Sequence, residues 1–235
     1  MKKLLEGLAQ FKRKDFIVHR ELFSRLKSKQ HPHTLFITCS DSRIDPNLIT
    51  GSLPGELFII RNIANLVPPY RDSDEYLATT AAIEYAVLSL GVENIIVCGH
   101  SNCGGCAAAL QQPSHLNHLP HTSKWLELAR ATSHQVHQEL PDGSPEERKE
   151  MMEKFNVIEQ INHLMDYPYI HLLSHIDKLN VSGWYYIIET GEISIYDRAV
   201  GDFVIPREMN SLSLTSLNRF TAYYDKLEQR LSRFE

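Results

Sequence analysis

The sequence predicts an α/β fold in which helices cover both faces of a sheet. Apolar runs at 34–39, 56–61 and 93–99 have the length of strands, and helical segments lie between them. The run at 93–99 shows no alternation of apolar and polar residues, as expected for a strand that is buried on both sides. The sheet is therefore expected to lie in the interior of the protein.

Two amphipathic helices are predicted ahead of the first strand, in an N-terminal helical arm of residues 1–30. Their apolar residues recur at helical spacing, namely Leu4, Leu5, Leu8 and Phe11, and then Leu22, Phe23 and Leu26. Such helices either pack on a partner subunit or cover the sheet of their own chain. The residues alone favour neither alternative.

The middle of the chain, from 110 to 167, is expected to be mostly helical. Ser144, Pro145 and Glu147 form the pattern of a capping box, with proline at the first helical position. The helix that follows is expected to place its apolar residues near one side, namely Met151, Phe155, Ile158 and Met165.

The last third of the chain predicts a hairpin and a final helix. Strands at 183–189 and 192–196 are separated by Thr190 and Gly191, a two-residue turn. An amphipathic helix is expected at 209–235. The sequence has no internal repeat, low-complexity tract or linker, so residues 1–235 are expected to form a single domain.

The composition argues against several classes of protein. The net charge of −5 at pH 7 gives no reason to expect nucleic acid or an anionic membrane as a partner. No apolar stretch is long enough to span a membrane, and polar residues interrupt any signal-peptide core. Three of the four cysteines cluster at 98, 103 and 106, which is typical of a metal or redox site in a reducing compartment. A cytoplasmic location is expected.

The first strand ends in residues whose side chains can bind a metal or take part in catalysis. Cys39, Asp41 and Arg43 lie at alternate positions, so on an extended chain they face the same side. Open α/β sheets place their ligands at the carboxyl ends of the strands. These three side chains therefore predict a site at this edge of the sheet.

The strand at 93–99 also ends in potential metal ligands. His100 and Cys103 are separated by a tight turn, and histidine and thiolate are favoured zinc ligands. With Cys39 from the first strand, they would supply three ligands and leave one position open, as in a catalytic zinc site. Gly104 and Gly105 follow at the start of a helix, where backbone N–H groups are available to an anion.

The same residues suggest two other interpretations. Cys103 and Cys106 form a C-x-x-C sequence, which is compatible with a redox dithiol. A dithiol leaves His100 and the residues after the first strand unexplained. A nucleophilic Ser40 or Ser42 would require a positioned histidine base, and the sequence indicates none.

The two strand-end patterns together resemble those of the β-class carbonic anhydrases, in particular the plant and cyanobacterial branch. The patterns are Cys39-Ser-Asp41-Ser-Arg43 and His100-Ser-Asn-Cys103-Gly104. The similarity extends roughly from residue 30 to residue 200. It includes Pro54-Gly-Glu56, Arg61-Asn62, Asn65-Leu-Val-Pro-Pro-Tyr70, Ala82-Ile-Glu-Tyr-Ala86 and Gly183-Trp184.

The resemblance implies a zinc site with Cys39, His100 and Cys103 as ligands. It implies that Asp41 either pairs with Arg43 or, in an inactive closed form, displaces water and binds the zinc itself. The substrate pocket would be lined by the Gly104 amide, by Gln30 of a partner subunit, and by Phe58, Ile63 and Tyr85.

The resemblance also implies an architecture and an assembly. We expect a mostly parallel four-stranded sheet with one added antiparallel edge strand. The chain would form an obligate homodimer or a dimer of dimers, with the N-terminal helices packed on a partner subunit.

The implied activity is the zinc-dependent, reversible hydration of CO2 to bicarbonate and a proton, by attack of zinc-bound hydroxide. Carbon disulfide and carbonyl sulfide hydrolases share the same zinc site and remain an alternative. A non-catalytic zinc- or bicarbonate-binding domain is a second alternative. Association with carboxysomes is not encoded in any residue of the sequence.

Overall fold

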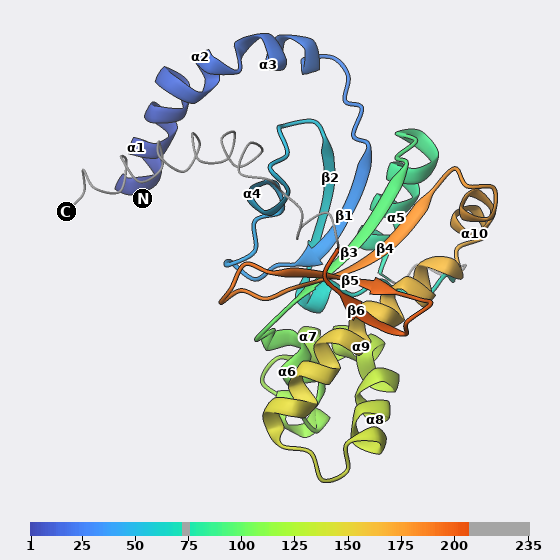
Figure 1. Ribbon diagram of the computed structural model, residues 1–235. Helices are drawn as coiled ribbons and strands as arrows, with labels where there is room; N and C mark the ends of the chain where they lie inside the picture. The colour runs from blue at the N-terminus through green and yellow to red at the C-terminus, as the bar shows by residue number, and fades with distance from the viewer. Residues whose placement is uncertain (72–75, 207–235) are drawn as a thin grey trace.

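The computed structural model describes residues 1–71 and 76–206, and the helix expected at 209–235 lies outside these residues. The described residues form a six-stranded sheet with the order β2-β1-β3-β4-β5-β6 (Figure 1). The strands are β1 Thr34–Cys39, β2 Leu57–Asn62, β3 Asn94–His100, β4 Asn180–Tyr186, β5 Ile193–Asp197 and β6 Asp202–Val204.

The first four strands are parallel to one another, and β5 and β6 are antiparallel to their neighbours. The predicted α/β fold is thereby confirmed, with one addition. Only one antiparallel strand was expected, whereas β6 extends the sheet beyond β5. Because β6 has only three residues, it is too short to produce a periodic pattern in the sequence.

The helices are grouped in the chain as expected. Their bounds are α1 Lys2–Gln10, α2 Phe16–Val18, α3 Arg20–Leu26, α4 Pro46–Thr50, α5 Leu77–Glu84, α6 Gly104–Ala109, α7 Pro120–Leu126, α8 Arg130–Glu139, α9 Pro145–Met165 and α10 Pro168–His175. Short 3-10 or π-helical turns join several of them, at Phe11–Asp15, Ile63–Asn65, Tyr85–Ser89, Pro113–Leu116 and Glu127–Ala129. Among the described helices, none is both long enough and apolar enough to cross a membrane.

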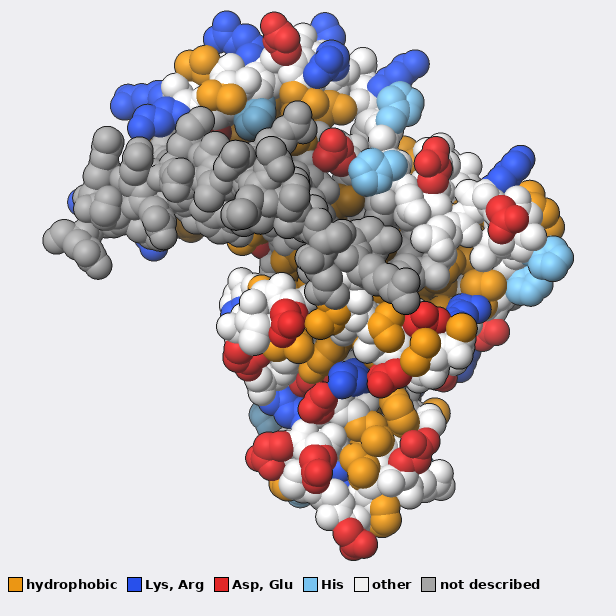
Figure 2. All heavy atoms as spheres, viewed as in Figure 1, with side chains coloured by type: hydrophobic (Ala, Val, Ile, Leu, Met, Phe, Trp, Pro, Cys, Tyr) orange, Lys and Arg blue, Asp and Glu red, His pale blue; other side chains and the backbone are white. Residues whose placement is uncertain are grey.

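The N-terminal arm, α1 to α3, projects away from the sheet (Figure 1). None of the residues in these helices is buried. The exposed apolar side chains include Leu4, Leu8, Phe11 and Ile17, and Figure 2 shows apolar side chains on the arm beside basic ones. The alternative in which these helices cover the sheet of their own chain is therefore wrong for this structure.

Strand β1 lies between β2 and β3 and is buried on both faces, since all six of its residues are buried. On one face, Leu35 and Ile37 join a core cluster with residues of β3 and of the helices α5 and α9. On the other face, Phe36 meets the ring of Trp184 edge-on, with the ring centroids 5.9 Å apart. The strand that carries Cys39 is therefore part of the interior of the protein.

Helix α9 begins as predicted, and its most buried residues include polar ones. The Ser144 hydroxyl accepts from the Glu147 N–H, and the Glu147 carboxylate accepts from the Ser144 N–H, which completes the capping box. Met151, Phe155 and Met165 pack against the core clusters, but these three residues and Ile158 are only partly buried. The buried residues are Met152, Glu153, Asn156, Val157, Gln160, Ile161 and Leu164. Three of these seven are polar, so the apolar pattern alone does not identify them.

Helix α9 approaches the sheet closely at Gly183 of β4. A Cβ atom at this position would lie 2.6 Å from the Ile161 side chain and 2.8 Å from the Val157 side chain. Both distances are shorter than real Cβ contacts, so a larger residue here would force the side chains of α9 to shift.

We therefore predict that Gly183→Ala lowers the free energy of unfolding by about 1–3 kcal/mol, the usual cost of overpacking a core. Urea denaturation monitored by circular dichroism measures this change. The matched control is the double variant with Val157→Ala, which removes part of the obstruction. The double variant should lose less than the sum of the two single changes. If the losses of unfolding free energy in the two single variants simply add up in the double variant, the close approach of α9 at Gly183 does not limit its packing on the sheet.

Candidate metal centre

The carboxyl ends of the parallel strands bring three potential ligands together. Cys39 is the last residue of β1, and His100 is the last residue of the neighbouring strand β3. Cys103 follows three residues later, at the N-terminal boundary of α6. Because β1 and β3 are adjacent and parallel, their ends lie side by side at one edge of the sheet (Figure 1).

The ligand atoms of Cys39, His100 and Cys103 all lie within 4.8 Å of one another, and all three residues are buried. The two sulfur atoms are 4.0 Å apart. Two thiolates at a tetrahedral zinc ion, each at ~2.3 Å, would be separated by roughly 3.8 Å. The observed spacing therefore fits a metal ion of this kind. No other such cluster is found in the part of the chain that the structure describes.

The orientation of His100 also fits a metal. Its Nδ1 lies 2.9 Å from the backbone oxygen of Ser101, which accepts a hydrogen from it. This bond assigns the proton to Nδ1 and leaves a lone pair on Nε2. Nε2 is buried and has no hydrogen-bond partner among the residues that the structure describes. An unpartnered buried nitrogen is costly, and a metal ion beside the two sulfurs would satisfy it.

The thiols of the cluster hold their protons tightly in the absence of a cation. The hydrogen bond with Cys103, together with burial, raises the pKa of the Cys39 thiol to about 12. The hydrogen bond with Cys106 and burial likewise raise the pKa of Cys103 to about 12. A bound metal reverses this preference, since it stabilises the thiolate directly. The site therefore favours a divalent cation that binds sulfur and imidazole strongly.

Asp41 and Arg43 form the ion pair expected beside the cluster. The Arg43 Nε donates to Asp41 Oδ1 at 2.9 Å, and Nη2 donates to Oδ2 at 2.7 Å. The Arg43 backbone N–H also donates to Oδ1. These bonds hold the pKa of the Asp41 carboxyl well below its usual range. Asp41 Oδ2 lies 4.0 Å from His100 Nε2, so the carboxylate borders the metal position without entering it.

Arg61 supports the backbone that carries this ion pair. Its Nε donates to the carbonyl oxygen of Cys39 at 3.1 Å, and its Nη2 donates to that of Asp41 at 2.6 Å. Charged donors make the stronger class of hydrogen bond. Arg61 therefore fixes the course of the chain from the end of β1 to Asp41.

Two of the predicted pocket residues, Ile63 and Gly104, lie at the metal cluster. A Cβ atom on the neighbouring Gly105 would approach Ile63 to 3.0 Å, so the turn after β2 packs against the start of α6. Trp125 Nε1 donates to the Ile63 carbonyl, and Ala64 adopts the left-handed conformation. The space around Gly104 is open. This arrangement leaves an apolar side chain and an open backbone position beside the ligands.

The other three predicted pocket residues are not brought to the metal cluster of their own chain. Phe58 pairs with Leu35, four residues before Cys39 in β1. A rise of ~3.3 Å per residue places it roughly 13 Å from that ligand. The rings of Phe58 and Tyr85 are 6.0 Å apart, and Tyr85 shares a pocket with Gln30. These three residues therefore gather at the opposite end of the strands.

Helix α9 supplies a buried residue that the sequence analysis missed. Glu153 is only 2% exposed, and its Oε1 accepts from the Cys103 N–H at 2.8 Å. Its Oε2 accepts from the Tyr185 hydroxyl at 2.8 Å, and burial raises the pKa of this carboxyl. The polar residues Glu153, Asn156 and Gln160 recur at helical spacing. This spacing is the feature of the sequence that indicates a shared polar side of the helix.

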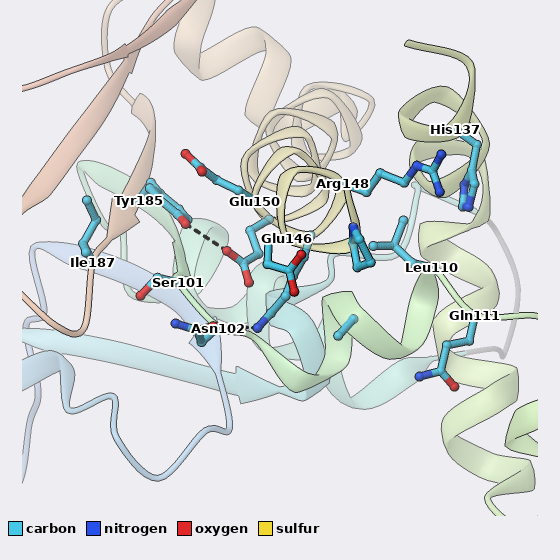
Figure 3. A pocket seen from close by; sticks show the side chains of 14 residues that line it. Ser101, Asn102, Leu110, Gln111, His137, Glu146, Arg148, Glu150, Tyr185 and Ile187 are labelled. Atoms are coloured by element: carbon cyan, nitrogen blue, oxygen red, sulfur yellow. Dashed lines mark hydrogen bonds between the residues drawn. The ribbon is translucent and has the colours of Figure 1, made fainter. Parts of the chain in front are cut away.

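A pocket of about 690 Å³ lies beside the loop of residues 100–103, which we call the metal loop. Figure 3 shows Ser101, Asn102 and Tyr185 along it, with α9 end-on and a hydrogen bond drawn from Tyr185. None of the three metal ligands lines this pocket. The pocket therefore adjoins the metal loop without opening onto the ligand atoms.

Comparison with known sequences identifies relatives for most of the chain. Residues 34–193 match the carbonic anhydrase family. A carbonic anhydrase of Synechocystis sp. is 42% identical over 207 residues, which are 88% of this chain and 75% of the relative. A carbonic anhydrase of Helicobacter pylori is 39% identical over 200 residues, which are 81% of this chain and 88% of the relative.

Solved structures agree with this relationship. The structure of the β-carbonic anhydrase CcaA has a TM-score of 0.84 and 43% sequence identity, and the match covers 88% of this chain and 99% of that one. Two tetrameric β-carbonic anhydrases have been described from Sordaria macrospora, and the structure compared has a TM-score of 0.73 and 32% identity, covering 86% of this chain and 98% of that one. With the buried Cys-His-Cys cluster and the Asp-Arg pair at the strand ends, these matches show that the chain belongs to the β-carbonic anhydrase family.

Proposed function

We propose that this protein catalyses the zinc-dependent, reversible hydration of CO2 to bicarbonate and a proton. The observation that carries the proposal is the buried cluster of Cys39, His100 and Cys103, in which the unpartnered Nε2 lies beside an ionised Asp41. Two sulfurs and one imidazole nitrogen suit zinc, and three protein ligands leave one position for a reactant. When bound, zinc would lower the pKa of a water molecule toward ~7 and so supply a nucleophile near neutral pH.

Asp41 has two tasks in this proposal. Its carboxylate is kept ionised by Arg43, so it can accept a hydrogen bond from the attacking water and orient it. The bidentate pairing also keeps the carboxylate out of the fourth coordination position. Arg43 therefore stabilises the form of the site that is open to substrate.

The substrate pocket combines apolar surface with a few donors. CO2 carries no net charge, and the exposed Ile63 side chain offers an apolar wall beside the metal loop. We propose that the Gly104 N–H, at the start of α6, stabilises the bicarbonate that forms. Because Gln30, Phe58 and Tyr85 lie at the far end of their own strands, we propose that a partner subunit contributes them.

We propose a homodimer, or a dimer of such dimers, as the working assembly. The apolar arm of α1 to α3 is exposed in the single chain and would be covered in the dimer. A cytoplasmic location remains the prediction from the cysteine content, and a single domain over 1–235 remains the prediction from the sequence.

The alternatives receive no support from the described residues. A non-catalytic zinc domain would close the site with a fourth protein ligand. Asp41, the nearest candidate, is instead paired with Arg43. The relatives compared above are named carbonic anhydrases, and no feature of the site favours a carbon disulfide or carbonyl sulfide hydrolase.

The first prediction of this proposal concerns the ligands. Cys103→Ser should release the metal and abolish CO2 hydration, because a serine hydroxyl is a far weaker zinc ligand than a thiolate. Cys106→Ser, one turn further along α6, should keep close to one zinc per folded chain and most of the activity. Metal analysis and stopped-flow hydration measure both effects. Equal zinc loss in the two variants would refute the ligand assignment.

The second prediction concerns the ion pair. Arg43→Ala should reduce hydration by roughly 10- to 100-fold, since Asp41 is then free to occupy the metal's open position. Arg43→Lys should lie in between, because lysine keeps the charge but not the two-point geometry. The initial rates of CO2 hydration by both variants are measured in a stopped-flow assay. Near-normal turnover of Arg43→Ala would contradict the role assigned to the pair.

The third prediction concerns the shared site. Cys103→Ser and Gln30→Ala are each expected to impair a homodimer. In a mixed dimer, one site would combine an intact metal cluster with an intact Gln30 of the partner subunit. Purified mixed dimers should therefore recover roughly half of the wild-type rate, since one of two equivalent sites is restored. If Gln30 acts within its own chain, no site is complete, and the mixed dimer would be no better than the Gln30→Ala homodimer.

A further inference from the structure

The carbonyl oxygen of Asn102, in the metal loop, is an anchor for Arg43. Arg43 Nη2 donates to this oxygen at 3.0 Å and to Asp41 Oδ2 at 2.7 Å. An Nη2 group carries two hydrogens, so these two bonds use both. Asn102 has a φ of 57°, in the left-handed region that asparagine tolerates better than most residues. The turn at Asn102 thus determines where the guanidinium is held.

The side chain of Asn102 is held from two other parts of the chain. Its Nδ2 donates to Glu189 Oε1 at 2.5 Å, and its Oδ1 accepts from Lys149 Nζ at 2.6 Å. Glu189 follows β4, whereas Lys149 lies near the start of α9. Because each partner is charged, both are hydrogen bonds of the stronger class.

Glu189 also holds the residue before Asn102. Its Oε2 accepts from the Ser101 hydroxyl at 2.9 Å, and the same hydroxyl accepts from the Ile188 N–H at 2.9 Å. One carboxylate therefore bonds two consecutive residues of the metal loop. These contacts lie next to the pocket of Figure 3, in which Ser101 and Asn102 are seen below α9.

We propose that Glu189 and Lys149 are positioning residues that act through Asn102 on Arg43. By fixing the Asn102 carbonyl, they favour the state in which Asp41 is paired with Arg43 over the state in which Asp41 occupies the metal's fourth coordination position. Without Glu189 and Lys149, the Asn102 carbonyl is free to move. Arg43 then loses this hydrogen-bond acceptor, and its ion pair with Asp41 becomes weaker. This inference rests on the proposed zinc site and the proposed function.

The test uses the metal-loaded protein with cobalt in place of zinc, and azide as the probe of the open position. Glu189→Ala should bind azide roughly ten-fold more weakly in a spectroscopic titration, the lower end of the range for outer partners of a metal site. Glu189→Gln, which keeps one acceptor, should show a smaller loss. Hydration should fall in parallel while the metal content stays unchanged. The matched control is Glu192→Ala in the same turn, since the Glu192 carboxylate accepts from the Thr190 hydroxyl of that turn, and this change should leave all three readouts unchanged.

A double-mutant cycle separates positioning from a general structural effect. If Glu189 acts through Arg43, then adding Glu189→Ala to Arg43→Ala should cause no further loss of azide affinity. Lys149→Ala should behave in the same way. The inference would be overturned by any of three results: unchanged azide affinity in Glu189→Ala, additive losses of azide affinity in the cycle, or loss of the metal. Failure of the proposed function would appear differently, as a wild-type protein that binds azide but does not hydrate CO2.

Discussion

The burial of two thiols and one imidazole nitrogen at a single point is the constraint on which the rest of the structure depends. Three ligand atoms within 4.8 Å of one another, one of them unpartnered, are unfavourable in the interior unless a cation joins them. The parallel pairing of β1 and β3 creates this point, because it places Cys39 and His100 at neighbouring strand ends. These strands are packed into a buried hydrophobic core, and Cys39 and Cys103 are themselves members of a core cluster.

The polar face of α9 stabilises both loops that surround the metal position. Glu153 accepts from the Cys103 N–H, and Asn156 donates to the Ala64 carbonyl in the turn that carries Ile63. Gln160 continues the series by accepting from the Val67 N–H and donating to Asn156. Every one of these bonds is buried, so the network is strong only while each member remains paired. The helix thus couples the metal loop to the apolar wall of the proposed pocket.

Much of the fold and of the metal cluster could be predicted from the sequence, because apolar runs define strands and strand ends define where Cys39 and His100 meet. The most buried side of α9 could not, since the buried Glu153 and Asn156 look like solvent-exposed residues until their partners are known. The distance of Phe58 from the cluster followed only from the strand register. The hydrogen bond from Asn102 to Glu189 depends on the conformations of two turns, which the pattern of neighbouring residues in the sequence does not specify.

The central claim is that one zinc ion, held by three protein ligands, makes the site active. The most direct measurement is stopped-flow CO2 hydration by the metal-free protein as zinc is returned in known amounts. The account predicts no activity without metal, and a rate that rises linearly and stops rising at one zinc per chain. Activity in the metal-free protein, or no activity in fully zinc-loaded protein, would contradict it.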